Sequence, residues 1–137
     1  MNDTVQQAAK MRDAFDVIEE SYEFMLAYAA QGRKRELGEG GGESQIRQYL
    51  KRFLAALSDL DDALSEGIGG PPGSEFSARF RRDVRVIRSV LEMLLSRPSI
   101  SSDMIDNTNG LIALRALLTD IFFVDQAVLP DRHGNSS

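Results

Sequence analysis

The chain has 137 residues, of which 27% are charged and 42% hydrophobic, and its formal net charge is −5. This length predicts one domain with a substantial core, and the composition is typical of neither a disordered chain nor a membrane protein. The absence of cysteine and the single histidine, His133, exclude disulfides, thiol chemistry and the common zinc sites. Because no apolar run reaches the length of a membrane span or a signal peptide, we expect a cytoplasmic protein.

The first predicted helix occupies residues 8–29. Its apolar residues recur at spacings of three and four, which places them along one side of a helix. A second apolar row beside the first widens the apolar face to about 200°. The narrow remaining face is almost entirely acidic. The principal apolar row consists of Ala8, Met11, Phe15, Ile18, Tyr22, Met25 and Ala29.

A glycine-rich loop, "GEGGG" at 38–42, follows the first helix and has basic residues on both sides. It lacks the Gly-Lys-Ser/Thr ending and the preceding strand of a phosphate-binding P-loop. Two interpretations remain: a solvated turn whose glutamates balance the cations, or a basic rim that binds an acidic partner. The net negative charge argues against nucleic acid as that partner. The candidate partner-binding residues are Arg33, Lys34, Arg35, Arg47, Lys51 and Arg52.

Two further helices are predicted at 46–64 and 76–94. The apolar row of the first of them begins at Ile46, and the helix ends before the breaker run "GIGGPPGSE" at 67–75. The next ends before Pro98 and carries arginines opposite its apolar row. We expect these arginines to lie near the acidic end of the preceding helix and to neutralise its carboxylates.

The fourth predicted helix begins at a serine cap, Ser99 or Ser101, and ends at Pro130. Its weak point is "DNTNG" at 106–110, where residues of poor helix propensity predict a kink or a break. The polar segment 130–137 is predicted to be a flexible tail, which leaves 1–129 as a single helical domain.

Together these elements predict an all-α fold, an antiparallel four-helix bundle in up-down-up-down order. The first, third and fourth helices carry more apolar surface than such a bundle buries by itself. Excess apolar surface usually contacts another chain. We therefore expect a homodimer or a complex with another protein, with the interface on one of these three helices.

One acidic cluster has a recognisable catalytic pattern: "EESYE" at 19–23, with "DLDD" at 59–62 across the predicted hairpin. Carboxylates three and four residues apart on one helix can hold Mg²⁺, which prefers oxygen ligands. The pattern resembles the Glu-Glu-x-x-Glu motif of the all-α nucleoside triphosphate pyrophosphatases, and Asp-x-x-Asp stands in place of that family's Glu-x-x-Asp. The plain alternative is a solvated acidic face. The magnesium ligands that the resemblance implies are Glu19, Glu20, Glu23, Asp59 and Asp62.

These observations leave two hypotheses for function. The leading one is a protein without catalytic residues or cofactor that acts by association with a protein partner or with itself, as an adaptor, assembly factor or regulatory subunit. The alternative, which rests on the resemblance, is a Mg²⁺-dependent pyrophosphatase-like hydrolase. No serine in the chain has a histidine base placed by sequence, and His133 lies outside every predicted helix.

Overall fold

The computed structural model describes residues 2–38 and 42–131. Within these residues the chain is all-helical and contains no strand, as the sequence predicts; one isolated β-bridge joins Gly38 and Ser44. Residues 132–137 of the predicted tail lie outside the described residues. The helices are α1 (Asn2–Ala30), α2 (Gln45–Leu64), α3 (Ser74–Leu95), α4 (Ser102–Asn109) and α5 (Ile112–Ala127), with a 3₁₀ turn, η1 (Pro71–Gly73), before α3.

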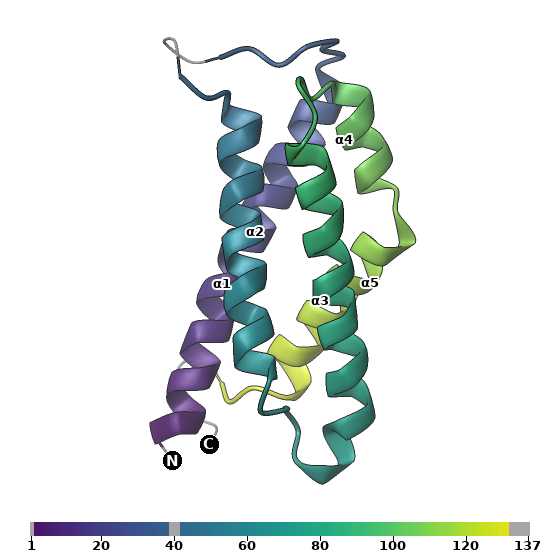
Figure 1. Cartoon of the computed structure of the whole chain (residues 1–137). Helices are drawn as coiled ribbons and strands as arrows, with labels where there is room; N and C mark the ends of the chain where they lie inside the picture. Colours follow the sequence, from purple (N-terminus) through teal and green to yellow (C-terminus); the bar gives the residue numbers. More distant parts are fainter. Residues whose placement is uncertain (1, 39–41, 132–137) are drawn as a thin grey trace.

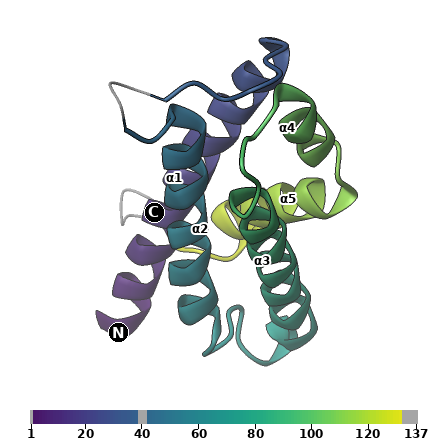
Figure 2. The same cartoon turned by 45° about the horizontal axis from the view of Figure 1, so that its top comes forward.

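The long helices form a layer in which α2 lies between α1 and α3 (Figure 1). The short α4 packs against α1, near the glycine-rich end of the molecule. Figure 2 shows that α5 runs across this layer and does not lie parallel to its helices. The main contact of α5 is with α3.

The prediction of a four-helix bundle is correct only in its class, because the fourth predicted helix is two helices. The break falls at the weak point of the sequence: Gly110 ends α4, and Leu111 has an extended backbone with φ −65° and ψ 133°. Asn107 and Asn109 gain little from helical geometry, so the chain turns there at small cost. As a result Leu111 is 38% exposed, and Leu117 is buried inside α5.

The core follows the predicted apolar rows most closely in α2. This helix lies between two neighbours, so its single row meets side chains from both sides. Phe15 of α1 and Phe80 of α3 are fully buried in the same cluster. The α2 residues that are at most 2% exposed are Ile46, Leu50, Phe53, Leu57, Leu60 and Leu64.

Serine hydroxyls fix the starts of two helices. Ser44 accepts a hydrogen bond from the backbone N–H of Arg47 at 3.3 Å, and Ser101 accepts one from Met104 at 3.2 Å. Both are N-caps that satisfy backbone donors left free at a helix start. The prediction that Ser99 or Ser101 caps the fourth segment is therefore confirmed for Ser101.

The turn between α2 and α3 is held by close packing. The backbone N–H of Ile68 donates to the Ser77 hydroxyl at 2.9 Å, and this hydroxyl donates back to the Ile68 carbonyl at 3.1 Å. A Cβ atom at Gly73 would lie 2.1 Å from that same carbonyl oxygen. Only glycine fits at this position, which explains part of the breaker run seen in the sequence.

Candidate functional site

The basic residues around the glycine-rich loop are largely engaged inside the molecule. Arg47 donates to the Glu36 carboxylate at 2.8 Å and to the carbonyls of Leu95 and Arg97 at 2.9 and 2.5 Å. Two further cations of the predicted rim also have intramolecular partners: Lys51 pairs with Glu43, and Arg52 pairs with Glu20 at 2.8 Å and lies over the ring of Tyr49.

The other three rim residues lie on the segment between α1 and the loop. Arg33 bonds to the Gln31 side chain, and its backbone N–H donates to Ser102 at 2.8 Å. Lys34 and Arg35 are exposed and have no ion pair with a described residue. Partner binding by this rim thus stays a prediction, and Lys34 and Arg35 are the side chains most available for it.

Glu36 is the centre of the network that sequence analysis did not find. Its carboxylate accepts from the Ser44 hydroxyl at 2.6 Å, from Arg47, and from the backbone N–H of Ile100 at 2.7 Å. Burial would raise the pKa of Glu36, but the hydrogen bonds from Arg47, Ser44 and Ile100 outweigh it and hold this pKa below its usual range. Glu36 therefore joins the loop to α2 and to the segment before α4, which is a structural role.

The five acids of the magnesium hypothesis do not come together. Glu19, Glu20 and Glu23 lie on the exposed side of α1, where Glu20 pairs with Arg52. Asp59 and Asp62 line two different surface hollows. Among the described residues, no group of three or more histidine, aspartate or glutamate side chains is arranged to hold a metal ion.

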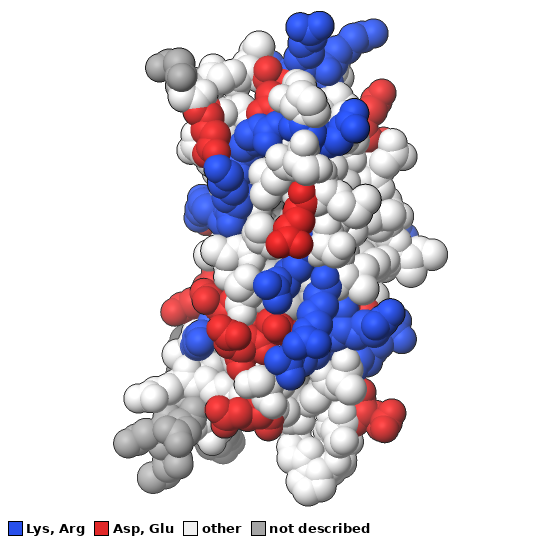
Figure 3. Space-filling view, viewed as in Figure 1, with Lys and Arg blue, Asp and Glu red and all other residues white. Residues whose placement is uncertain are grey.

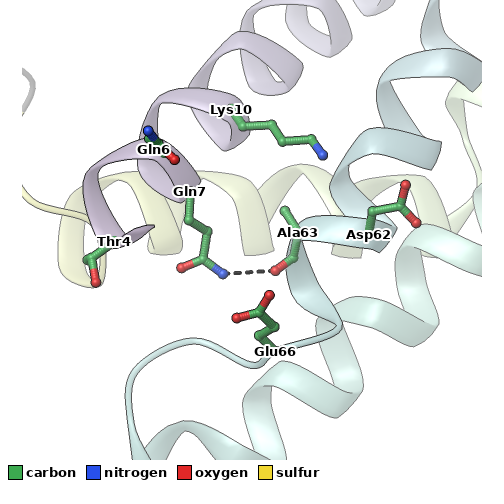
Figure 4. Close-up of a pocket in the computed structure, with 7 residues that line it drawn as sticks. All are labelled: Thr4, Gln6, Gln7, Lys10, Asp62, Ala63 and Glu66. Atoms are coloured by element: carbon green, nitrogen blue, oxygen red, sulfur yellow. Dashed lines mark hydrogen bonds between the residues drawn. The ribbon is translucent and has the colours of Figure 1, made fainter. Parts of the chain in front are cut away.

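The hollow that contains Asp62 lies between the start of α1 and the end of α2 (Figure 4). It measures about 430 Å³ and is open to solvent. Gln7 reaches across it and donates to the Ala63 carbonyl at 2.8 Å. Lys10 and Glu66 line the same hollow without an ion pair to a described residue. The hydrogen bond of Gln7 fastens the start of α1 to the end of α2.

A cluster of three arginines surrounds one buried carboxylate between α2 and α3. Asp61 is 7% exposed; its Oδ1 accepts from the Nε atoms of Arg81 and Arg85 at 2.9 and 3.1 Å, and its Oδ2 accepts from Arg88 at 3.4 Å. Burial would raise the pKa of Asp61, but the hydrogen bonds and charges of Arg81 and Arg85 outweigh it and lower this pKa. The prediction that arginines of the third helix neutralise acids of the second is confirmed for Asp61.

A pair of carboxylates lies between α3 and α5 and was missed by sequence analysis. Asp83 is buried and pairs with Arg79 at 3.3 Å. Asp120 faces it: burial, the hydrogen bond to Asp83 and the charge of Asp83 raise the pKa of Asp120 to about 8. The two carboxyl groups therefore share one proton at neutral pH. The only sequence signal was an aspartate on each of two amphipathic helices, flanking the apolar row.

This carboxylate pair predicts a loss of stability between mildly acidic and mildly alkaline pH. Because the folded-state pKa of Asp120 is raised, its contribution is fully present below the unfolded-state pKa of about 4, decreases as the pH rises, and is lost once the pH passes about 8. Asp120→Asn keeps a donor toward Asp83 and cannot ionise. We expect melting temperatures from pH 6 to pH 9 to fall for the wild type and to stay flatter for this variant. Asp106→Asn, at an exposed carboxylate, is the control; equal pH profiles for all three proteins would contradict the shared proton.

The outer side of α5 carries exposed apolar side chains. Ile112 is 83% exposed, and Phe122 and Phe123 are 55% and 51% exposed. Phe123 meets Phe76 of α3 edge to face, with ring centroids 5.1 Å apart, whereas no ring contact is found for Phe122 within the described residues. We call the exposed side chains of Leu111, Ile112, Thr119, Phe122 and Phe123 the α5 face.

None of the helices in the described part of the chain has the length and apolar character needed to cross a membrane. Comparison of the chain with protein-family models, with curated proteins and with solved structures found no match, so the residues and their geometry are the basis for the functional proposal.

Proposed function

We propose that the protein acts by association with other protein chains, without catalysis, and that it forms a homodimer through the α5 face. One observation carries the proposal. Of the eight large hydrophobic side chains exposed in the described residues, four lie between 111 and 123. Apolar surface concentrated in this way commonly marks a protein–protein contact.

The charges around the α5 face favour a second copy of the chain as the partner. A twofold interface brings the same patch of both copies together, so like charges on it would repel. Arg115 is the only exposed charged residue of α5, because Asp120 turns toward Asp83 and Asp125 pairs with Arg12 of α1 at 2.8 Å. The small side chain of Thr119, between Ile112 and Phe122, permits two copies of α5 to approach closely.

Sedimentation velocity over a range of concentrations tests this proposal. We expect the wild type to form a dimer and Ile112→Glu combined with Phe122→Glu to weaken it at least hundredfold, about 2.7 kcal/mol, because two exposed apolar anchors are lost. Both side chains are exposed, so the monomer should keep its fold, which circular dichroism checks.

The matched control is Leu26→Glu, which places the same charge at an exposed apolar position on α1. This variant should remain dimeric. A wild-type protein that sediments as a monomer at every concentration would overturn the homodimer, as would an equal effect of Leu26→Glu. A role as adaptor, assembly factor or regulatory subunit in the cytoplasm follows as part of the same proposal.

A further inference from the structure

The central part of α3, residues 79–88, carries more positive charge than its carboxylate partners neutralise. Five arginines lie between 79 and 88, and the carboxylates that pair with them are Asp61 and Asp83, so three positive charges remain (5 − 2 = 3). The chain as a whole has a net charge of −5. Figure 3 shows a blue area over this part of α3, with acidic side chains beside it. The five are Arg79, Arg81, Arg82, Arg85 and Arg88.

The buried carboxylate positions the guanidinium groups while leaving donors free. Arg81 and Arg85 bind Asp61 through Nε, and their terminal Nη groups make no hydrogen bond to the described residues. Arg82 is exposed and has no ion-pair partner in the part of the chain that the structure describes. Side chains that are already fixed lose less conformational entropy when they bind a ligand. Asp61 therefore preorganises Arg81 and Arg85, whose Nη groups bind no other described residue.

These arginines surround an open hollow of about 500 Å³ on the helix surface. Ala78, Val86 and Ser89 complete its lining, so the cations lie next to a small apolar area. Arginine beside apolar side chains is the composition typical of protein interfaces. The hollow is shallow and extends along α3, which suits a segment of chain better than an enclosed small molecule.

From this juxtaposition we propose that the outer face of α3 binds an acidic segment of a partner protein, whose carboxylates accept hydrogen bonds from Arg81, Arg82 and Arg85. An isolated phosphate is disfavoured because residues 78–89 lie inside a helix, where the backbone N–H groups are already bonded. A long nucleic acid is disfavoured because the chain as a whole has a net charge of −5 and would repel an extended polyanion. A short acidic segment with an apolar residue between its carboxylates avoids both problems.

The test uses fluorescence anisotropy with a labelled helical peptide that repeats Glu-Leu-Ala-Glu. We expect the wild type to bind this peptide, with an affinity that falls as salt is raised. Arg82→Glu should weaken binding by about tenfold or more, because it removes one charge-assisted contact and adds repulsion. Arg97→Glu, an equal charge change at an exposed arginine whose side chain has no hydrogen bond to a described residue, should bind as the wild type does.

The proposal would be overturned if the wild type did not bind the acidic peptide, or if Arg82→Glu and Arg97→Glu lowered the affinity equally. It would also be overturned if only Arg35→Glu lowered the affinity, because that result would place the site on the loop rim. Stronger binding of a phosphorylated peptide or of single-stranded DNA would also contradict an acidic protein segment as the ligand. Sedimentation of Arg82→Glu, expected to remain dimeric, separates failure at this site from failure of association through α5.

Discussion

Replacing Asp61 with alanine is expected to lower the free energy of unfolding by about 3 kcal/mol. The carboxylate is buried and accepts from three guanidinium groups, so its removal leaves Arg81, Arg85 and Arg88 close together without a counter-charge. Loss of charge-assisted hydrogen bonds and repulsion between the arginines act in the same direction. For a chain of this size the melting temperature should fall by about 10 °C. Urea denaturation measures the change directly.

The neighbouring residue supplies the control for this experiment. Asp62 is exposed and has no ion pair with a described residue, so Asp62→Ala should change the free energy of unfolding by less than about 0.5 kcal/mol. Equal effects at Asp61 and Asp62 would show that the arginine cluster contributes no more than general surface charge.

The second large effect is expected at Glu36. Glu36→Ala removes the acceptor for the Ser44 hydroxyl, for Arg47 and for the Ile100 N–H, and it should cost about 2–3 kcal/mol. Hydrogen exchange should quicken first in the segments 31–38 and 96–101, because Glu36 joins them. Glu43→Ala removes only an exposed pair with Lys51 and should cost less than about 0.5 kcal/mol. Unchanged exchange in both segments would argue against this role of Glu36.

Acid should destabilise the protein through the same two carboxylates. The pKa values of Glu36 and Asp61 are lowered in the folded state, so their contribution is present above the unfolded-state values, about 4, and is lost as the pH falls through the folded-state values. Because the contribution of Asp120 decreases as the pH rises from about 4 to about 8, these three groups together should stabilise the protein most near the unfolded-state pKa values, about 4.

The sequence predicted the parts of the fold that depend on local patterns. The row from Ile46 to Leu64 is buried as expected, because spacing alone determines which side of a helix is apolar. The weak helix propensity at 106–110 located the break. The same local pattern could not give the direction of α5 after the break, because that direction depends on long-range contacts such as the one between Arg12 and Asp125.

The candidate sites were harder to predict for the same reason. Arg47 and Lys34 look alike in the sequence, yet only the fold brings Leu95 and Arg97 carbonyls to Arg47. Asp61 occupies a helix flank that is polar in the sequence, and its burial follows from the approach of α3. The proximity of Asp83 and Asp120 requires α5 to cross α3, which local periodicity does not specify.

The break at Gly110 and Leu111 also has a consequence for folding kinetics. The ion pair between Arg12 and Asp125 closes a loop of 113 residues, whereas α1, α2 and α3 meet through neighbouring segments of the chain. Such a distant closure carries a larger entropic cost, so docking of α5 should come late. Until then the α3 surface that α5 covers is open to solvent, and a nascent chain at that stage would be the form most prone to aggregate.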